Sequence, residues 1–458
     1  MKFVDTLRKY WYLVTTIILI CSLLSLYSES SYKVLVIIIV VVIWCLLGMF
    51  LKKFSLASLL ILFLILPFNI TYQLPYSFFG IILSNPFVDG IIVNYLVPTV
   101  SILDLGVLLL FLSFLFEGDV VSRWKGFSFI KIFFVFVVYL FIQNLFVGEA
   151  VSVLNSLRLL LYIFTFYHLS LNIKKLLNQR VLKYLLLLSI GLVLVQGVIA
   201  LIQFSGGTSL GLSFLGESQV VSGMTGSSFL TLNGQLYLRG YGTFPHPNVF
   251  SGWLLFNIFF GWYLFEKMNR KRDYSIILMI ISSLVLVLTF SRIGFLVCGV
   301  VWVVFLINIF VRINSKKNFS FVGLISERVL NLIGGGDSSW SDRVGLMRSS
   351  FNIIKNNLLM GVGLGRFVSN MGESVPRGGN GILLLQPVHN VFLLSVSELG
   401  LVGTGLLGTL LYFFLRGRRF TVRFVTVLVC LFIIGMFDHY LFSLGQGVGM
   451  VLVLLSFG

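Results

Sequence analysis

Histidine is scarce in this sequence, and most of its histidines stand at the ends of long apolar segments. The chain of 458 residues contains 4 histidines. His246, His389 and His439 each flank an apolar segment, whereas His168 lies within one. A neutral imidazole, whose ordinary pKa is about 6.5, accepts a proton at neutral pH. Three of the scarce titratable groups thus gather at one predicted surface, and His389 among them is a candidate for a general base.

Arginines stand near the same segment ends, at Arg239, Arg292, Arg343, Arg348 and Arg366. The planar guanidinium binds phosphate oxygens through two parallel hydrogen bonds, which suits arginine to a phosphate-bearing ligand. Each arginine also has a structural interpretation, because its charged end can reach lipid head groups. His246 and Asn248 belong to the motif PHPN, whose residues likewise have structural uses at a helix start.

Motifs for a metal or a nucleotide are missing from the sequence. It contains no HExxH or DxD motif, and its 4 cysteines lie in apolar segments without CxxC spacing. The glycine-rich stretch 361–365 resembles a phosphate loop, but no Lys-Ser/Thr pair follows it. We therefore expect no metal, no other cofactor and no nucleotide.

The elements that carry these residues must be membrane helices. The composition is 58% hydrophobic and 11% charged, whereas soluble domains are about 45–50% apolar and about 25% charged. So few charges cannot coat a soluble core of this size. Apolar stretches of about 20 residues predict transmembrane helices. They lie at 10–28, 33–51, 54–73, 99–117, 127–147, 151–171, 182–204, 247–265, 275–291, 293–311, 389–415, 420–437 and 440–457.

The basic residues predict the orientation of these helices. Most of them fall in connections that alternate along the chain, and the positive-inside rule places these connections and both termini in the cytoplasm. The net charge of +17 thus reflects membrane topology and not a nucleic-acid partner. This arrangement needs an even number of crossings, so we favour a weak crossing at 319–335; the alternative is a re-entrant segment there.

Two longer connections are predicted on the outer side of one integral membrane domain, 1–458. They are the outer loop 205–246 and the large outer loop 336–388. Long ordered loops usually carry function. Within the second loop, apolar residues at helical spacing over 342–358 predict an amphipathic helix on the membrane surface. A third connection, 74–98, is apolar and contains prolines, and we assign it no chemistry.

Motifs in the second half of the chain together resemble the O-antigen ligase/polymerase superfamily. In order, they are LRGYGTFPHPNVFSG, TFSRIGFL, DRVGLMRSSFNIIKNNLLMGVGLGRF, PVHNVFLLSVSELGLVG and FDHYLFSLGQG. The resemblance implies an all-α, GT-C-like polytopic fold of about 12–14 transmembrane helices, with a large periplasmic loop. It also implies a polyprenyl-diphosphate-linked glycan donor, a lipid or glycan acceptor, and transfer at the outer face of a bacterial inner membrane. One departure is that the family usually has a clear span where this chain has only 319–335.

The resemblance also implies roles for single residues. His389 matches the catalytic histidine, and Arg239, Arg292 and Arg343 match arginines that contact the diphosphate. His246 and Asn248 match a signature without a specified role. Three further residues are supporting candidates near His389: Asn390, Arg366 and Glu398.

The expected reaction is a single displacement with inversion, in which His389 takes the proton of an acceptor hydroxyl and arginines stabilise the leaving diphosphate. A ligase and a polymerase of lipid-linked repeat units would share this donor, so both stay open. A lipid-linked glycan flippase or transporter is the alternative of another class, although such proteins place ionisable groups in mid-membrane and often show inverted repeats.

Overall fold

Helices make up most of the structure, a computed structural model that describes residues 31–74, 77–78, 81–82, 84–117, 127–221, 227–232, 235–269, 272–313, 338–377, 383–416 and 418–458. Seven helices in these ranges are long and apolar enough to cross a membrane. Five further apolar helices are shorter. The predicted mostly helical architecture is confirmed, and it is compatible with a multi-pass membrane protein.

The first half of the chain contributes the helices α2 (Ser31–Leu51), α3 (Phe54–Ile65), α4 (Ile102–Phe116), α5 (Phe127–Val147), α6 (Ala150–Leu176) and α7 (Gln179–Gly206). The second half contributes α8 (Pro247–Lys267), α9 (Asp273–Val287), α10 (Arg292–Ile313), α12 (Ser338–Asn356), α13 (Val391–Leu415), α14 (Val422–Phe437), α15 (Tyr440–Ser443) and α16 (Gly445–Ser456). The predicted crossings 10–28 and 319–335 lie outside the described residues.

Short antiparallel strand pairs connect some of these helices. Between α3 and α4, β1 (Thr71–Gln73) pairs with β6 (Thr99–Ser101) and encloses two small hairpins and the 3-10 turn Asn94–Leu96. The hairpins are formed by β2 (Ser77–Phe78) with β3 (Ile81–Ile82), and by β4 (Phe87–Val88) with β5 (Ile91–Ile92). Between α7 and α8, β7 (Phe229–Leu232) pairs with β8 (Gln235–Leu238).

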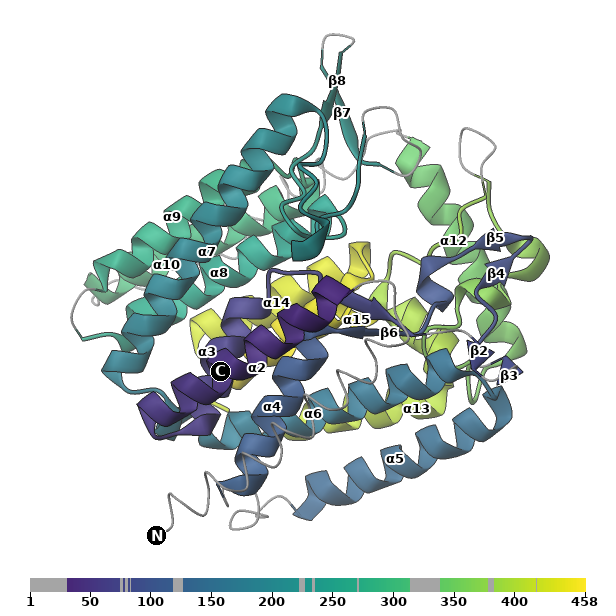
Figure 1. Ribbon diagram of the computed structural model, residues 1–458, viewed down its shortest axis with the longest axis horizontal. Coiled ribbons are helices and arrows are strands. Elements are labelled where there is room, and N and C mark those ends of the chain that lie inside the picture. Colours follow the sequence, from purple (N-terminus) through teal and green to yellow (C-terminus); the bar gives the residue numbers. More distant parts are fainter. Residues whose placement is uncertain are drawn as a thin grey trace.

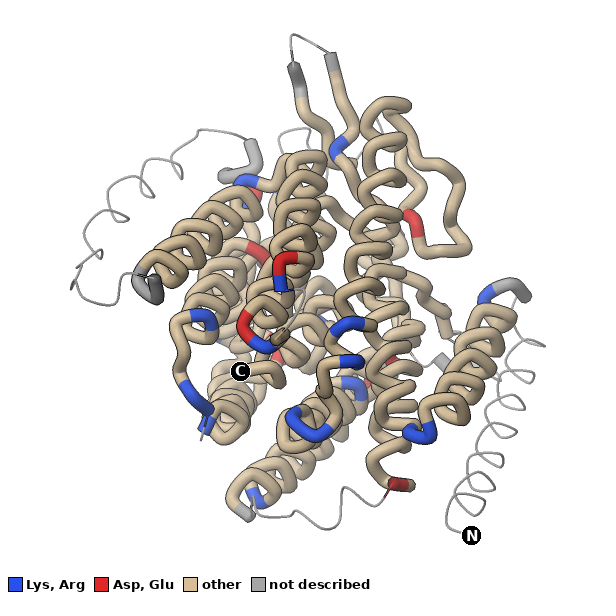
Figure 2. Tube along the Cα trace, turned by 90° about the vertical axis from the view of Figure 1, so that its left-hand side faces the viewer, with Lys and Arg blue, Asp and Glu red and all other residues tan. Residues whose placement is uncertain are grey.

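Helix α8 lies in the middle of the bundle and most of its side chains are buried. Its aromatic residues pack against other helices; for example, the ring of Phe260 lies 5.0 Å from that of Phe63 in α3. In Figure 1, α12 and the hairpins β2–β3 and β4–β5 gather on the right-hand side of the bundle. Figure 2 shows lysines and arginines mostly at helix ends and connections, with uncharged helix between them. This is the charge distribution that a membrane bundle needs.

Some of the predicted spans are interrupted. Helix α3 ends at Ile65, well short of 73, because Pro67 follows and has no backbone N–H to continue the helical hydrogen bonds. The predicted span 440–457 divides at Leu444, whose backbone is extended, into α15 and α16. Helix α9 ends at Val287, and Phe290 then adopts a positive φ of 46°.

The break inside α13 has a different cause. Gly400 has φ 63° and ψ −178°, which interrupts the helix. There, residues of the loop after α12 pair with α13 instead: Val362 N donates to Ser397 O over 3.0 Å, and Leu401 N donates to Leu358 O over 2.9 Å. Gln143 of α5 donates to the Glu398 carbonyl over 2.8 Å. The groups freed by the break are thus satisfied by neighbouring segments, as a membrane interior requires.

A helix is present at the predicted position, since α12 spans Ser338–Asn356. Leu346 and Ile353 are buried, whereas Phe351 is exposed. The buried residues form a small core with Val388 and Leu394, which hold the start of α13 against α12.

Candidate active site

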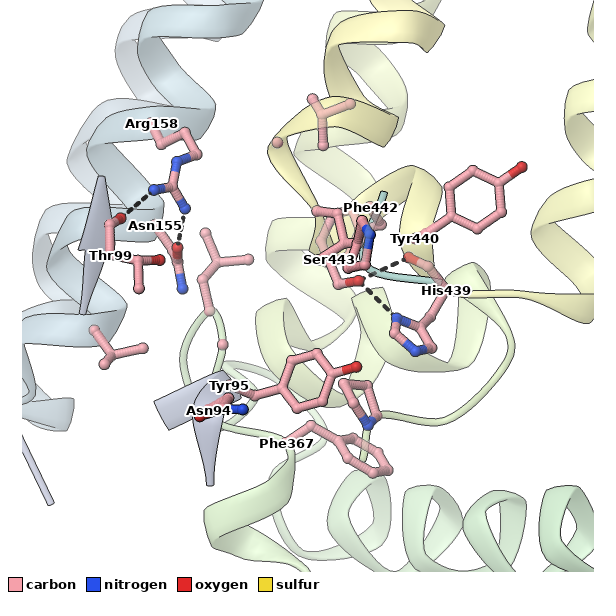
Figure 3. Close-up of a pocket in the computed structure, with 18 of the residues that line it drawn as sticks. Asn94, Tyr95, Thr99, Asn155, Arg158, Phe367, His439, Tyr440, Phe442 and Ser443 are labelled. Atoms are coloured by element: carbon pink, nitrogen blue, oxygen red, sulfur yellow. Dashed lines mark hydrogen bonds between the residues drawn. The ribbon is translucent and has the colours of Figure 1, made fainter. Parts of the chain in front are cut away.

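A cavity of about 580 Å³ lies where several helix ends meet the small strands. Its wall comes from β1, the turn before β6, the first turns of α6, the start of α8, and the segments before α13 and after α14. Small-molecule sites are typically about 300–1,000 Å³. Figure 3 shows Asn155 and Arg158 on one side of this cavity and His439, Tyr440 and Ser443 on the other.

The three histidines predicted at one surface meet at this cavity. His246, His389 and His439 all line it, together with Asp438. The ring centroids of His389 and His439 lie 5.1 Å apart, with an angle of 77° between the ring planes. Residues separated by as much as 193 positions in the chain are therefore brought to one site.

Asp438 is the acidic member of this cluster. Its Oδ2 accepts a hydrogen bond from Asn248 Nδ2 over 3.0 Å, and its Oδ1 accepts one from the His439 backbone N–H over 2.8 Å. Burial raises the pKa of Asp438, but the neighbouring histidines and the Asn248 amide outweigh burial, so the pKa is lowered overall. Asp438 is therefore a carboxylate at neutral pH.

The histidines around it are neutral. Burial lowers the pKa of His439 to about 4 despite the opposing effect of Asp438. Burial also lowers the pKa of His389, and Arg343 lowers it further, whereas Asp438 raises it. Nδ1 of His389 is buried and makes no hydrogen bond within the described residues. A neutral imidazole with an uncommitted nitrogen at a cavity is suited to accept a proton.

His246 is held by two contacts. Its Nδ1 accepts the backbone N–H of Asn248 over 3.1 Å, which makes it the N-cap of α8 ahead of Pro247. Its Nε2 lies 2.8 Å from the Ser228 hydroxyl. Because a neutral imidazole carries one N–H, an accepting Nδ1 leaves the proton on Nε2, which donates to Ser228. Its fixed orientation makes His246 a positioning residue more than a mobile base.

One of the predicted arginines, Arg239, adjoins this cluster through hydrogen bonds. Arg239 donates from Nε to the Thr289 carbonyl over 2.7 Å and from Nη2 to Asn248 Oδ1 over 3.0 Å. Burial, with a smaller contribution from the charge of Arg292, lowers the pKa of Arg239 to about 10. Burial also lowers the pKa of Arg343, with Asp438 opposing and Arg292 adding to the decrease.

The charge of Arg292 lowers the pKa of both Arg239 and Arg343. Asp438 is the acid that acts on both Arg239 and Arg343. The cavity wall itself includes Asp438 and His389 but not these arginines. We call these three arginines the arginine cluster; Arg239 is linked to the cavity wall through Asn248, which accepts from Arg239 and donates to Asp438.

The supporting candidates have separate positions. Asn390 caps α13 by accepting Leu393 N over 2.9 Å, and it donates to the Met436 carbonyl over 3.2 Å. It therefore holds His389 beside the end of α14. Glu398 lines the cavity and accepts the Phe367 N–H over 3.3 Å. Arg366 does not line this cavity and lies 3.7 Å from Glu149, so it is apart from the histidines.

The sequence analysis did not select some residues that the structure places here. Asp438 is the main one, and its signal is an acidic residue between an apolar helix and a histidine in the motif FDHY. Tyr95 comes from the connection to which no chemistry was assigned, and its ring lies 6.0 Å from that of His439. Arg158 and Asp104 are oppositely charged residues in two apolar helices, which is a signal for a buried functional pair.

No protein-family model matches the chain, and no curated protein sequence matches it. Among the described residues, no group of three or more His, Cys, Asp or Glu side chains is placed to hold a metal ion. The site must therefore be interpreted from its own geometry, in which neutral imidazoles, one carboxylate and an arginine cluster surround one end of a cavity.

Proposed function

We propose that this protein is a membrane glycosyltransferase of the O-antigen ligase type, which transfers a glycan from a polyprenyl-diphosphate-linked donor to an acceptor hydroxyl. The observation that carries the proposal is the bridge at Asn248: its amide accepts from Arg239 and donates to Asp438, which lines the same cavity as His389. A base and a group of phosphate-binding cations are thus close enough to act on one substrate.

The chemistry follows from these groups. His389 takes the proton from the acceptor hydroxyl as its oxygen attacks the anomeric carbon of the donor. The bond between that carbon and the phosphate oxygen breaks, and its electron pair leaves with the polyprenyl diphosphate. Arginines beside the leaving group stabilise the negative charge that develops on it. Displacement from the opposite face inverts the anomeric configuration.

The arrangement in the membrane belongs to the same proposal. We place both termini in the cytoplasm of a bacterium, with about 12–14 crossings of the inner membrane and the cavity at the outer face. The gathering of α12 and the small hairpins on one side of the bundle supports an extramembrane region there. The long apolar helices supply walls for a polyprenyl tail.

The test uses purified protein in nanodiscs with an undecaprenyl-diphosphate oligosaccharide and excess EDTA, and it follows release of undecaprenyl diphosphate. Wild-type protein is expected to release it in the presence of an acceptor, and His389→Ala is expected to lose at least 100-fold in rate (about 3 kcal/mol). Size-exclusion elution and thermal unfolding show whether the variant is folded. Full activity in a folded His389→Ala protein would exclude His389 as the base.

The acceptor that gains sugar distinguishes the remaining possibilities. Transfer to a lipid core oligosaccharide supports a ligase, whereas transfer to a second lipid-linked repeat unit supports a polymerase. If no acceptor gains sugar but the intact lipid moves between leaflets, the flippase alternative replaces the proposal.

A further inference from the structure

One end of the cavity has a polar wall that the proposed reaction does not use. It includes Asn155 and Thr99 beside Arg158, and further amide and hydroxyl side chains of the lining are Asn69, Thr71, Gln73 and Asn94. Figure 3 shows Asn155 and Arg158 here, across the cavity from His439. The side-chain amides of Asn69, Gln73 and Asn94 make no hydrogen bond within the described residues and are at least partly exposed. They are therefore available to a ligand.

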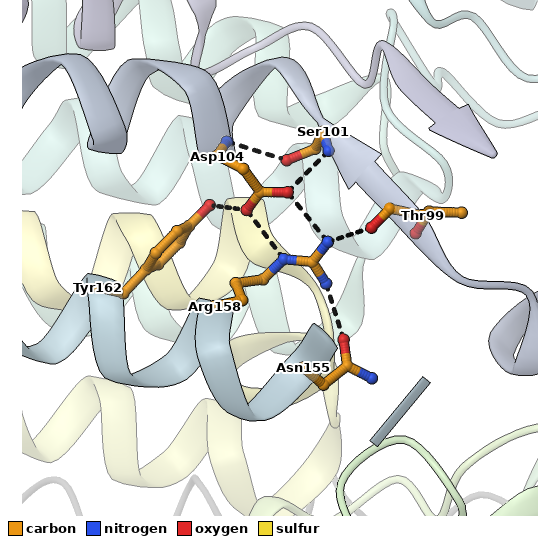
Figure 4. A network of polar contacts seen from close by, with 6 residues as sticks. All are labelled: Thr99, Ser101, Asp104, Asn155, Arg158 and Tyr162. Carbon is orange, nitrogen blue, oxygen red and sulfur yellow. Dashed lines mark hydrogen bonds and ion pairs between the residues drawn. The ribbon is translucent and has the colours of Figure 1, made fainter. Parts of the chain in front are cut away.

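Arg158 is the cation in this wall, and Asp104 neutralises it. The guanidinium donates from Nε to Asp104 Oδ1 over 2.8 Å and from Nη2 to Oδ2 over 2.9 Å, a bidentate pair (Figure 4). Tyr162 also donates to Asp104 over 2.8 Å. Because the carboxylate cancels the charge at close range, this end of the cavity carries no net charge to attract an anion.

Arg158 nevertheless keeps one donor for a ligand. A guanidinium has five N–H groups. Arg158 uses Nε for Asp104, both N–H groups of Nη2 for Asp104 and the Thr99 carbonyl, and one of Nη1 for Asn155 Oδ1. The second N–H of Nη1 makes no hydrogen bond within the described residues. Its position is fixed because the other four are all occupied.

The aromatic ring of Tyr95 connects this polar wall with the histidines. Tyr95 follows Asn94 in the same 3-10 turn, lines the cavity and contacts His439 edge to face at 6.0 Å. Its side chain is 38% exposed. A planar ring next to amides offers an apolar face and hydrogen-bonding groups together, which fits a ligand with both C–H faces and hydroxyl edges.

We propose that this amide-rich end of the cavity binds an uncharged sugar unit of the glycan substrate. Unpaired amides, hydroxyls and one spare guanidinium N–H complement the donors and acceptors of sugar hydroxyls, and the neutralised Arg158 gives no preference for a uronic acid or a phosphate. The diphosphate is served by the arginine cluster at the other end. This inference rests on the proposed function for the presence of a glycan ligand.

The experiment measures binding without turnover. Full-length protein in nanodiscs is titrated with neutral trisaccharides, maltotriose and chitotriose, and with trigalacturonate as the anionic match, using saturation-transfer NMR and calorimetry. At least one neutral probe is expected to bind more tightly than trigalacturonate. Asn94→Ala and Gln73→Ala are expected to weaken its binding about fivefold each, which corresponds to one hydrogen bond of about 1 kcal/mol. Asn352→Ala, an exposed asparagine on α12, is the matched control and should bind as wild type does.

A charge variant tests the neutralisation directly. Asp104→Asn leaves Arg158 with its positive charge, so selectivity should shift at least tenfold towards trigalacturonate. Because Asp104 also caps α4 through Ser101, this variant can unfold; the Asn94 and Gln73 variants, at exposed positions, then decide. Tighter binding of trigalacturonate to wild type, no binding of any neutral probe, or equal binding in the Asn94, Gln73 and Asn352 variants overturns the inference.

The outcome separates this inference from the proposed function. If neutral sugar binds at this wall but no undecaprenyl diphosphate is released, the subsite stands and the transfer reaction fails. If release occurs and the Asn94 and Gln73 variants keep both binding and KM, the reaction stands and the subsite fails. His389→Ala is expected to retain sugar binding while it loses release.

Discussion

Asn248 stands between a cation and an anion, with Oδ1 accepting from Arg239 and Nδ2 donating to Asp438, each over 3.0 Å. A direct ion pair between Arg239 and Asp438 would neutralise the charge of the arginine. The intervening amide satisfies both groups and leaves much of that charge to act on a ligand. The motif PHPN thus supplies a helix cap, His246, and a polar spacer, Asn248, from adjacent positions.

The charge and shape of Arg343 are expected to matter for the donor. Replacing the guanidinium by an ammonium in Arg343→Lys keeps the charge but removes bidentate binding, so the KM for the lipid-linked donor should rise about tenfold, or about 1.4 kcal/mol. Arg348→Lys on the same helix, where the residue is exposed, is the matched control. Steady-state kinetics check this, and equal KM values in the two variants would contradict the role of Arg343.

Asp438→Asn is expected to change the pH dependence of the reaction. The carboxylate raises the pKa of His389, so its removal lowers that pKa further. The acidic limb of the pH profile of kcat/KM should therefore move to lower pH. The plateau value of kcat/KM should fall because His389 is then a weaker base. Asp342→Asn should move the limb in the same direction by less, because Asp342 acts on His389 less strongly. A limb that moves to higher pH would contradict His389 as the base.

The buried His439 predicts a loss of stability in acid. Its pKa is lowered from 6.5 to about 4 by burial, so between these pH values the unfolded chain binds a proton and the folded protein does not. Stability should decrease as the pH falls from 6.5 to 4, by at most about 3 kcal/mol from this residue. Apparent Tm in detergent at pH 7.5 and pH 5 measures the loss. His439→Gln should lose less than wild type over this interval, and equal losses would show that His439 is not responsible.

Gly400 is expected to tolerate no side chain. Its positive φ is unfavourable for other residues by about 1–3 kcal/mol, and a Cβ there would lie 2.3 Å from the Leu359 carbonyl oxygen. Gly400→Ala should therefore lower the apparent Tm and disturb the loop that precedes His389. Gly405→Ala in the same helix meets nothing within 4 Å and should be neutral or stabilising. Similar Tm values for the two variants would show that the break in α13 is not required.

Much of the helical framework follows from the sequence, because length and apolar composition identify a membrane helix without knowledge of its neighbours. The start of α8 was also readable, since proline and a cap residue have local meanings. The end of α3 was predicted too late, at 73, although Pro67 is a local signal for the end of a helix. The break at Gly400 was not predictable, because its cause is pairing with Leu358 and Val362 of another segment.

The candidate site was likewise predictable from the sequence only in part. His246, His389 and His439 were conspicuous because polar residues are rare in such a chain, and they do line one cavity. Asp438 was missed because its importance comes from Asn248, which is 190 positions away and donates to it. Arg366 was selected for its place near His389 in the chain, but the loop turns it towards Glu149. Proximity in sequence is a weak guide once glycines redirect the backbone.

The cap on α8 also makes the first turn of this central helix sensitive to protonation of His246. His246 begins the helix by offering a lone pair on Nδ1 to the Asn248 N–H. Once protonated, that nitrogen would carry a hydrogen of its own, and two donors would face each other across the same 3.1 Å. Protonation of His246 at low pH would therefore remove the N-cap hydrogen bond and disturb Asn248, which bridges Arg239 and Asp438. The electrostatics of the site and the integrity of the helix at its centre are thus governed by the same lone pair.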